Sequence, residues 1–184
     1  MTDETAQDAE TDALLPTPPQ ALMARLDAMG IPYVLHRHKP VFTCEESAFL
    51  KDVIPGLHVK NLFLRDKKGR MCLVVVPDEL ALDLKILAPV LGFDRFSFGS
   101  PERLWTHLGV RPGSVCPFAA INDTDGAVEV VLHRPVAEAP VISAHPMHNT
   151  MSLALSGPDV VRFLAAVNHP PRILDLAPYA RAAA

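Results

Sequence analysis

The sequence predicts a single compact α/β (α+β) domain in which helices surround a mixed β-sheet. Its 184 residues are 49% hydrophobic, which is enough to bury one sizeable core. Residues 60–76 hold two apolar runs on either side of a charged turn with Gly69, the pattern of a β-hairpin. Runs of strand and helix period follow in mixed order, so we expect roughly six or seven strands and about five helices.

The first 13 residues differ in charge from the rest of the chain. They contain five acidic side chains and no Lys or Arg, so we expect a disordered acidic leader over 1–13. Residues 14–184 form the predicted domain and carry 17 basic and 16 acidic side chains. This near-neutral body argues against a protein that holds nucleic acid chiefly by counterion release, although a local basic patch remains compatible with it.

The N-terminal part of the domain predicts a helix, an extended segment and a second helix. Thr17 is the expected N-cap of a helix with proline in its first turn and an apolar stripe that ends at Gly30. Residues 33–35 are extended and apolar. Thr43 and Glu46 then have capping-box spacing at the start of a short helix.

The middle of the chain predicts the hairpin and two helices. The second strand of the hairpin, residues 72–76, has no polar alternation and is expected to be buried on both faces. A helix should follow over 79–91, then a short segment around Phe96. Another helix, capped by Ser100, should run to Leu108.

Residues 109–117 break every periodic pattern. Glycine and proline residues interrupt a largely apolar stretch, which indicates a tight loop packed against the core. This loop is expected to lead to a strand near Ala120. Strands are expected over 128–133, 141–144 and 151–155, and a closing helix over 158–167.

Lys60 and Asn61 stand at the entrance of the first hairpin strand. A lysine there commonly protects a strand edge, and this is the simpler interpretation. The alternative is that Lys60 holds a phosphate as a compact point charge while Asn61 offers an amide to a ligand.

Two further segments could carry chemistry. The sequence GSVCP, residues 113–117, is either a connector or a loop whose amides stabilise an oxyanion. His145 is either a structural histidine or a group that orients or shuttles a proton. His145 and His148, like His36 and His38, lack a third ligand and disfavour a metal site.

Three scattered cysteines, with no CxxC pair, no secretory signal and no transmembrane run, indicate a reducing, cytoplasmic setting. Cys72 lies in a core-like strand and Cys44 at a helix start. Cys116 has no recognisable partner for nucleophilic catalysis.

Taken together, Lys60 and Asn61 before "LFL", the "GSVCP" loop and "HPMHNT" resemble the YbaK/aminoacyl-tRNA editing domain family over about residues 20–176. "KPVFTCEES" is similar to its ProX or PrdX branch, which resembles the insertion domain of bacterial prolyl-tRNA synthetase. The resemblance implies a partly barrel-like mixed sheet and hydrolysis in trans of mischarged tRNA(Pro), with Ala-tRNA(Pro) as the favoured substrate. The implied partners are the acceptor end of that tRNA carrying a small amino acid, and prolyl-tRNA synthetase, with no membrane, metal or cofactor.

The resemblance also assigns roles to residues. Lys60 would contact the phosphate of the terminal adenosine, Gly113 and Pro117 would end the family's GxxxP loop, and His145 would line the pocket. We expect no protein nucleophile, because an aminoacyl ester is labile and needs only a positioned water and an oxyanion site. The residues expected to act in catalysis are Lys60, Asn61, Gly113, Ser114, Val115 and His145, and those expected to bind substrate are Thr43, Phe49, Leu50, Pro117 and Asn149.

Three other functions stay open on the sequence. The first is hydrolysis of Cys-tRNA(Pro), as in the YbaK-proper branch, and the departures at Cys116 and His148 from the side chains expected in relatives leave the choice of substrate open. The second is a non-catalytic module that binds tRNA or a synthetase with the same pocket. The third is a metal-dependent hydrolase built on the four histidines. A basic cluster over 65–70 would meet the acceptor stem or simply be solvated.

Overall fold

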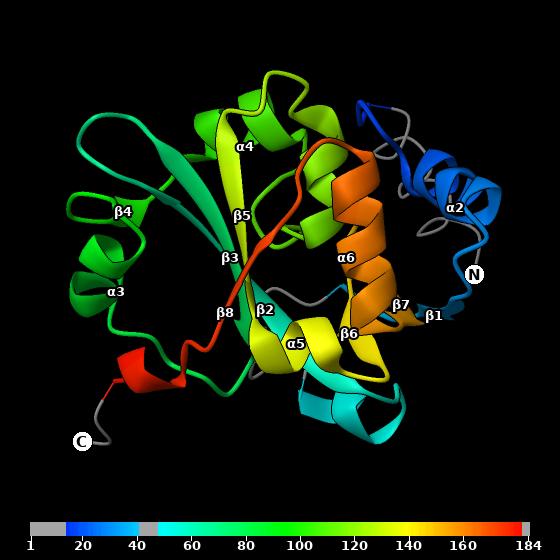
Figure 1. Ribbon diagram of the computed structural model, residues 1–184. Coiled ribbons are helices and arrows are strands. Elements are labelled where there is room, and N and C mark those ends of the chain that lie inside the picture. Colours follow the sequence, from blue (N-terminus) through cyan, green and yellow to red (C-terminus); the bar gives the residue numbers. More distant parts are fainter. Residues whose placement is uncertain (1–13, 41–47, 182–184) are drawn as a thin grey trace.

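The computed structural model describes residues 14–40 and 48–181, and Figure 1 shows how their helices and strands are arranged. The helices are α2 (Pro19–Ala28), α3 (Leu84–Val90), α4 (Pro101–Leu108), α5 (Arg134–Glu138) and α6 (Gly157–Ala166), with short 3-10 helices η1 (Ala48–Asp52), η2 (Pro117–Asn122) and η3 (Ala177–Tyr179). The strands are β1 (Val34–Arg37), β2 (Leu57–Arg65), β3 (Met71–Pro77), β4 (Ser97–Phe98), β5 (Val128–His133), β6 (Ile142–Ala144), β7 (Met151–Leu155) and β8 (Arg172–Leu174).

One mixed sheet contains all eight described strands, and this confirms the predicted fold class. Its order is β1-β7-β6-β2-β3-β5-β8, and β4 pairs with β2 beside this path. The β2–β3 hairpin is antiparallel, as predicted, whereas β2 pairs with β6 and β3 pairs with β5 in parallel. The long strand β2 thus joins the two halves of the sheet, with β6 beside its start and β4 beside its end.

Helices cover both faces of the sheet, as Figure 1 shows. The larger core packs α2, α4, η2 and α6 against one face, and its buried centre includes the edge-to-face pair of Phe118 and Phe163, 5.4 Å between ring centroids. The smaller core lies under α3 on the other face. Buried residues alternate between these cores along β3, so this strand is covered on both sides, as its unbroken apolar run predicts.

Several predicted elements match closely. Ser100 caps α4 through a hydrogen bond from the Arg103 amide, and the helix ends at Gly109 with φ +61°. The strands over 128–133, 141–144 and 151–155 and the closing helix lie within one residue of the expected bounds. The loop over 109–117 packs against the larger core through Val110 and Cys116. The first 13 residues and the Thr43–Glu46 capping box lie outside the described residues.

Other predictions were wrong in detail. The first helix is capped by Pro18, because the Thr17 hydroxyl instead donates to the Asn122 side chain at 2.7 Å. The helix expected over 79–91 begins at Leu84, because Leu82 forms a β-bridge with Ala180.

The remaining differences concern strands and short helices. The extended segment expected over 33–35 is shifted, since β1 starts at Val34. The strand expected near Ala120 is the 3-10 helix η2. The sequence reading missed α5 and β8. No helix in the described ranges is long and apolar enough to cross a membrane.

Candidate functional site

The parallel pairing of β2 with β6 places the strand that carries Lys60 beside the strand that leads to His145. His58 lies opposite Ser143, and paired residues in a sheet point to the same face. Lys60 follows His58 by two residues on β2 and so points to the same face, and His145 comes directly after β6. On β7, which pairs with β6 in the opposite direction, Ser152 follows Met151, whose carbonyl oxygen meets the His145 ring. The short strands therefore gather side chains that are far apart in the sequence.

A small cavity of about 50 Å³ lies on this face. Polar side chains from β2, β6 and β7, or from the residues next to these strands, line it. The predicted substrate-binding residue Leu50 and Asp78 also belong to the lining. The lining residues are Leu50, His58, Val59, Asp78, Ser143, Ala144, His145 and Ser152. We call it the histidine cavity.

The Lys60 ammonium is held beside the histidine cavity by a main-chain oxygen. Its Nζ donates a hydrogen bond of 2.8 Å to the main-chain oxygen of Asp78, which lines the cavity. The Asp78 carboxylate instead pairs with Lys51 at 3.0 Å. Within the described ranges no acidic side chain forms an ion pair with Lys60. An ammonium has three donors, so this half-buried one has two beyond the bond to the Asp78 carbonyl that could meet an anionic ligand.

His145 is oriented by the main chain and kept neutral by its surroundings. Its Nδ1 lies 2.8 Å from the Met151 carbonyl oxygen, and because a carbonyl only accepts, Nδ1 carries the proton. Burial lowers the pKa of His145 below its ordinary value. The Met151 hydrogen bond opposes this shift, whereas the charges of His38, His148 and His58 add to it. Nε2 of the neutral ring is left with a lone pair.

Two other histidines surround His145 with fixed tautomers. His38 donates from Nδ1 to the Lys39 carbonyl and meets the Ser152 hydroxyl at 3.0 Å through Nε2, and its ring centroid is 6.0 Å from that of His145. His58 donates from Nε2 to the Ile54 carbonyl at 3.0 Å. These bonds hold the rings as hydrogen-bonding groups. In the part of the chain that the structure describes, no three His, Cys, Asp or Glu residues are grouped to hold a metal ion.

The GSVCP loop adjoins the segment after His145. The Sγ of Cys116 lies 3.8 Å from the Met147 sulfur, and burial raises the pKa of Cys116 to about 11, so this thiol is not a ready nucleophile. Gly113 has φ +88°, which suits glycine in a tight turn. The Ser114 amide closes this turn by donating to the Arg111 carbonyl at 3.0 Å. The Ser114 amide is therefore already engaged within the turn.

A second cavity, of about 130 Å³, contains the predicted residues Ser114 and Asn149. Its other lining residues are Leu15, Arg111, Pro112, Met147 and His148. Segment 145–149 contributes to both cavities, since His145 lines the first and residues 147–149 line the second. The predicted residues are thus divided between two cavities that this segment connects.

The remaining predicted residues have different surroundings. Asn61 lies on the opposite face of β2 from Lys60, and its buried side-chain oxygen has no hydrogen-bond partner within the described ranges. Val115 is half-buried against the larger core, and buried Pro117 begins η2. The side chains of Thr43 and Phe49 lie outside the described residues.

Sequence reasoning missed His58, Asp78 and Ser152 as neighbours of the site. His58 had a signal, because residues two apart on a strand share a face and His58 precedes Lys60 by two. Asp78 had none, because its contribution to Lys60 is a main-chain oxygen, which every residue possesses.

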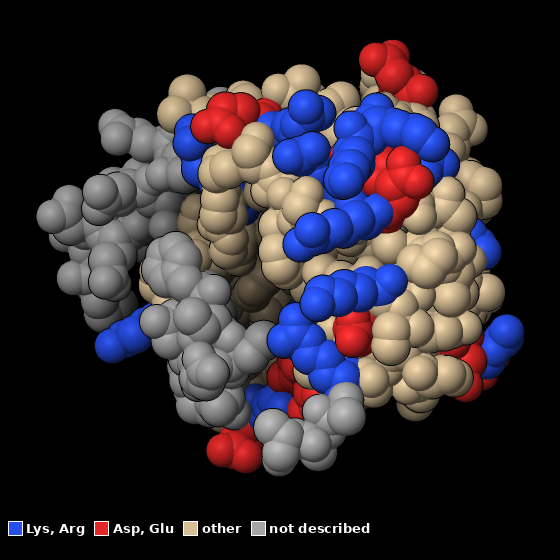
Figure 2. Space-filling view, turned by 90° about the vertical axis from the view of Figure 1, so that its left-hand side faces the viewer, with Lys and Arg blue, Asp and Glu red and all other residues tan. Residues whose placement is uncertain are grey.

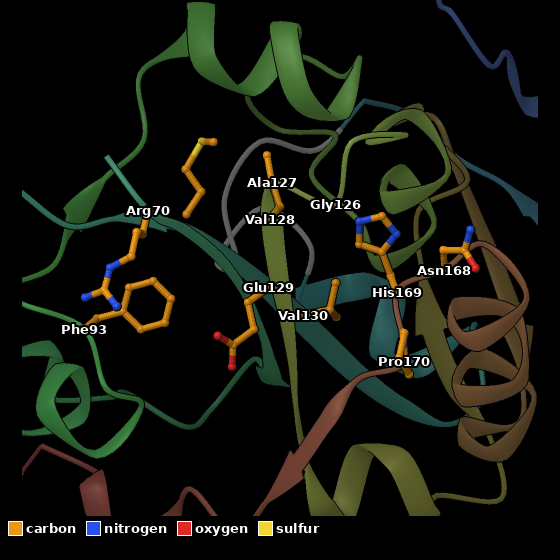
Figure 3. A pocket seen from close by; sticks show the side chains of 11 residues that line it. Arg70, Phe93, Gly126, Ala127, Val128, Glu129, Val130, Asn168, His169 and Pro170 are labelled. Atoms are coloured by element: carbon orange, nitrogen blue, oxygen red, sulfur yellow. The ribbon is translucent and has the colours of Figure 1, made fainter. Parts of the chain in front are cut away.

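A larger cavity of about 420 Å³ lies at the other end of β3 and β5. Figure 3 shows Arg70 beside the Phe93 ring on one flank of β5 and His169 with Pro170 on the other. The guanidinium carbon of Arg70 is 4.8 Å from the ring centroid, and His169 bonds to Asp123 at 2.9 Å. None of the predicted site residues lines this cavity.

Comparison with known proteins gives one consistent family. The family model described as the aminoacyl-tRNA editing domain matches residues 38–163. The prolyl-tRNA editing protein ProX of Acetoanaerobium sticklandii is 36% identical over 158 residues, which cover 85% of this chain and 96% of that protein. The prolyl-tRNA synthetase associated domain-containing protein 1 of Danio rerio is 35% identical over 152 residues, 82% of this chain and 83% of that protein.

Solved structures agree on the fold. A crystal structure proposed to be a trans-editing enzyme for prolyl-tRNA synthetase superposes with a TM-score of 0.66 at 18% identity, covering 88% of this chain and 96% of that chain. The predicted resemblance is confirmed by sequence and by fold. The chain therefore belongs to the aminoacyl-tRNA editing domain family and is an aminoacyl-tRNA deacylase.

Proposed function

We propose that the protein removes a wrongly attached small amino acid from tRNA(Pro) in trans, with Ala-tRNA(Pro) as its principal substrate. The observation that carries the proposal is Lys60, whose ammonium is held by the Asp78 carbonyl beside the histidine cavity and pairs with no acidic side chain of the described part. A phosphate of the terminal adenosine would supply the missing negative charge. The names of the ProX and Danio rerio relatives support proline-specific tRNA as the substrate.

The chemistry requires little beyond positioning. An aminoacyl ester hydrolyses readily once water and the carbonyl carbon are held in line and the developing oxyanion is stabilised. Nε2 of neutral His145 offers a lone pair that would orient the attacking water or take its proton. The amides of Gly113 and Val115 remain candidates for the oxyanion, whereas that of Ser114 is used in the turn.

The choice of amino acid would rest on size. The histidine cavity holds about 50 Å³, and one water-sized probe needs about 10–15 Å³. A space of a few water molecules suits the methyl group of alanine better than the pyrrolidine ring of proline. Exclusion of a larger ring is a stronger filter than affinity, since one methylene changes binding by only about 1–3 kcal/mol.

The substrate assay is a panel of tRNA(Pro) charged with Ala, Cys, Ser or Pro. We expect rapid ester loss from Ala-tRNA(Pro) and none above the uncatalysed rate from Pro-tRNA(Pro). Preferred loss from Cys-tRNA(Pro) would move the protein to cysteine editing. Binding of all four without ester loss would contradict the proposed substrate class.

The setting of this reaction follows from its substrate. Because charged tRNA is made and used in the cytoplasm, we place the protein there, and prolyl-tRNA synthetase is its proposed partner. Co-sedimentation with the synthetase, with and without tRNA(Pro), tests this association. A complex that forms only with tRNA would assign the contact to the RNA.

A further inference from the structure

A group of basic side chains gathers at the turn that joins β2 to β3. The neighbouring segment before β4 adds to it, because the end of β2 pairs with β4. The acidic residues of these two segments are Asp66, which is inaccessible to solvent, and Asp94. We call the following residues the basic turn: Arg65, Lys67, Lys68, Arg70 and Arg95. Figure 2, which views the side of the molecule where Figure 1 shows β4, has a band of Lys and Arg side chains across that face.

The turn is rigidly built around Asp66. Its carboxylate accepts hydrogen bonds from the amides of Lys68 at 2.9 Å and Arg70 at 3.0 Å, and from the Arg70 side chain at 2.8 Å. Gly69, with φ +81°, completes the reversal. Lys67 and Lys68 are therefore presented from a fixed backbone.

Part of this positive charge is not neutralised. Arg70 pairs with Asp66 and lies over the Phe93 ring, and Lys68 pairs with Asp94 at 3.3 Å. Lys67 and Arg95 are exposed and form no ion pair with any residue of the ranges 14–40 and 48–181. Unpaired cations on a rigid turn suit a polyanion better than a protein surface of mixed charge.

The distance from Lys60 to the basic turn is close to the length of the unpaired 3′ end of a tRNA. Lys60 and Arg65 lie five residues apart on β2, a span of about 17 Å at 3.3–3.4 Å per residue. The unpaired 3′ end of a tRNA has four nucleotides, about 14 Å long when stacked at about 3.4 Å each. With its last phosphate at Lys60, the RNA would become double-stranded close to the turn.

We infer that the basic turn binds the phosphate backbone of the acceptor stem, while Lys60 holds the 3′ end. This inference rests on the proposed function for the identity of the RNA. The stem contact is non-specific in sequence, because phosphates carry no base information. It contributes affinity and positions the ester at the histidine cavity.

The test compares two substrates that differ only in the stem. One is an alanylated minihelix of the tRNA(Pro) acceptor arm, and the other is an alanylated single-stranded oligonucleotide ending in CCA. The variant is the double substitution Lys67→Gln and Arg95→Gln, which removes unpaired charges and leaves Asp66 intact. The control removes two exposed charges from α2 and α5, far from the turn in Figure 1, through Arg25→Gln and Arg134→Gln.

We expect the variant to lose kcat/KM on the minihelix by on the order of tenfold and to keep its rate on the oligonucleotide within about twofold. The slope of log kcat/KM against log salt should become shallower by about 2 on the minihelix, one for each lost phosphate contact. The control should behave as the wild type.

Three results would overturn the inference. These are equal loss on both substrates, no loss on the minihelix, or loss only after prolyl-tRNA synthetase is added, which would assign the turn to a protein partner. If the wild type hydrolyses neither substrate, the proposed function fails. The contact with the acceptor stem can then still be tested by itself, through fluorescence anisotropy with a minihelix that carries no amino acid. Weaker binding by the variant than by the control supports the stem contact, and equal binding refutes it.

Discussion

Replacing Lys60 by methionine tests the proposed contact between Lys60 and a phosphate of the tRNA directly. Methionine keeps the apolar stem of the side chain and removes the charge that Asp78 holds at 2.8 Å through its main-chain oxygen. A hydrogen bond to a charged group contributes about 1.5–3 kcal/mol. At about 1.4 kcal/mol per factor of ten, kcat/KM for Ala-tRNA(Pro) should fall by about 10- to 150-fold. Lys60→Ala, which also removes the stem, should abolish measurable deacylation.

The assay is loss of labelled alanine from Ala-tRNA(Pro) under single-turnover conditions, with enzyme concentration varied to separate binding from the chemical step. Lys60→Arg retains a cation and should recover part of the activity. Lys85→Met removes an exposed lysine on α3 and serves as the matched control. The free energy of unfolding should change by no more than about 1 kcal/mol in Lys60→Met, since one hydrogen bond to a carbonyl is lost. A folded Lys60→Met variant with wild-type kcat/KM would refute the assignment of Lys60.

Three further predictions concern His145, Asp66 and Gly157. The folded-state pKa of His145 is lowered, so the ring should be neutral above about pH 6.5, its unperturbed value. The deacylation rate should therefore be constant above that pH and fall only in acid. If His145→Gln has the same pH–rate profile as the wild type, His145 is not the titrating group. Burial acts to raise the pKa of Asp66, but its hydrogen bonds with Arg70 lower it overall, so Asp66→Asn should reduce the urea midpoint at neutral pH. This difference should disappear as pH falls from about 4 through the lowered pKa, and a difference that persists in acid would contradict the reasoning. At Gly157 an added Cβ would lie 2.1 Å from the Val136 carbonyl oxygen, so Gly157→Ala should cost about 1–3 kcal/mol in urea unfolding, and a loss below about 0.5 kcal/mol would show that α5 and α6 can separate there.

Local signals in the sequence predicted much of this fold because they coincide with the tertiary contacts. Ser100 caps α4 by a bond within its own turn, and the apolar run of β3 meets a core on each face. Predictions failed where a residue far along the chain binds the group that the local pattern assigns to a cap or a helix. The Thr17 hydroxyl bonds to Asn122, 105 residues away, and Leu82 pairs with Ala180, so neither residue can do what its local pattern indicates.

The candidate site was predictable to the extent that it consists of side chains on strands. His145, which follows β6, lines the histidine cavity, and Lys60 on β2 bonds to Asp78 of its lining, whereas Leu50 reaches the cavity from η1. Main-chain groups could not be anticipated, because the carbonyl of Asp78 and the amide of Ser114 acquire their roles only from the backbone conformation.

One continuous strand carries both Lys60 and the start of the basic turn. If both bind the RNA as we infer, the length of β2 sets the length of the unpaired 3′ end that fits between them. The separation of the two anchoring points is fixed by the number of residues in β2, with no hinge between them. Two residues inserted into each strand of the hairpin would lengthen this separation by about 7 Å, which is about two nucleotides. Such a protein would favour charged RNAs whose 3′ tails are longer by that amount and would discriminate against the natural tail.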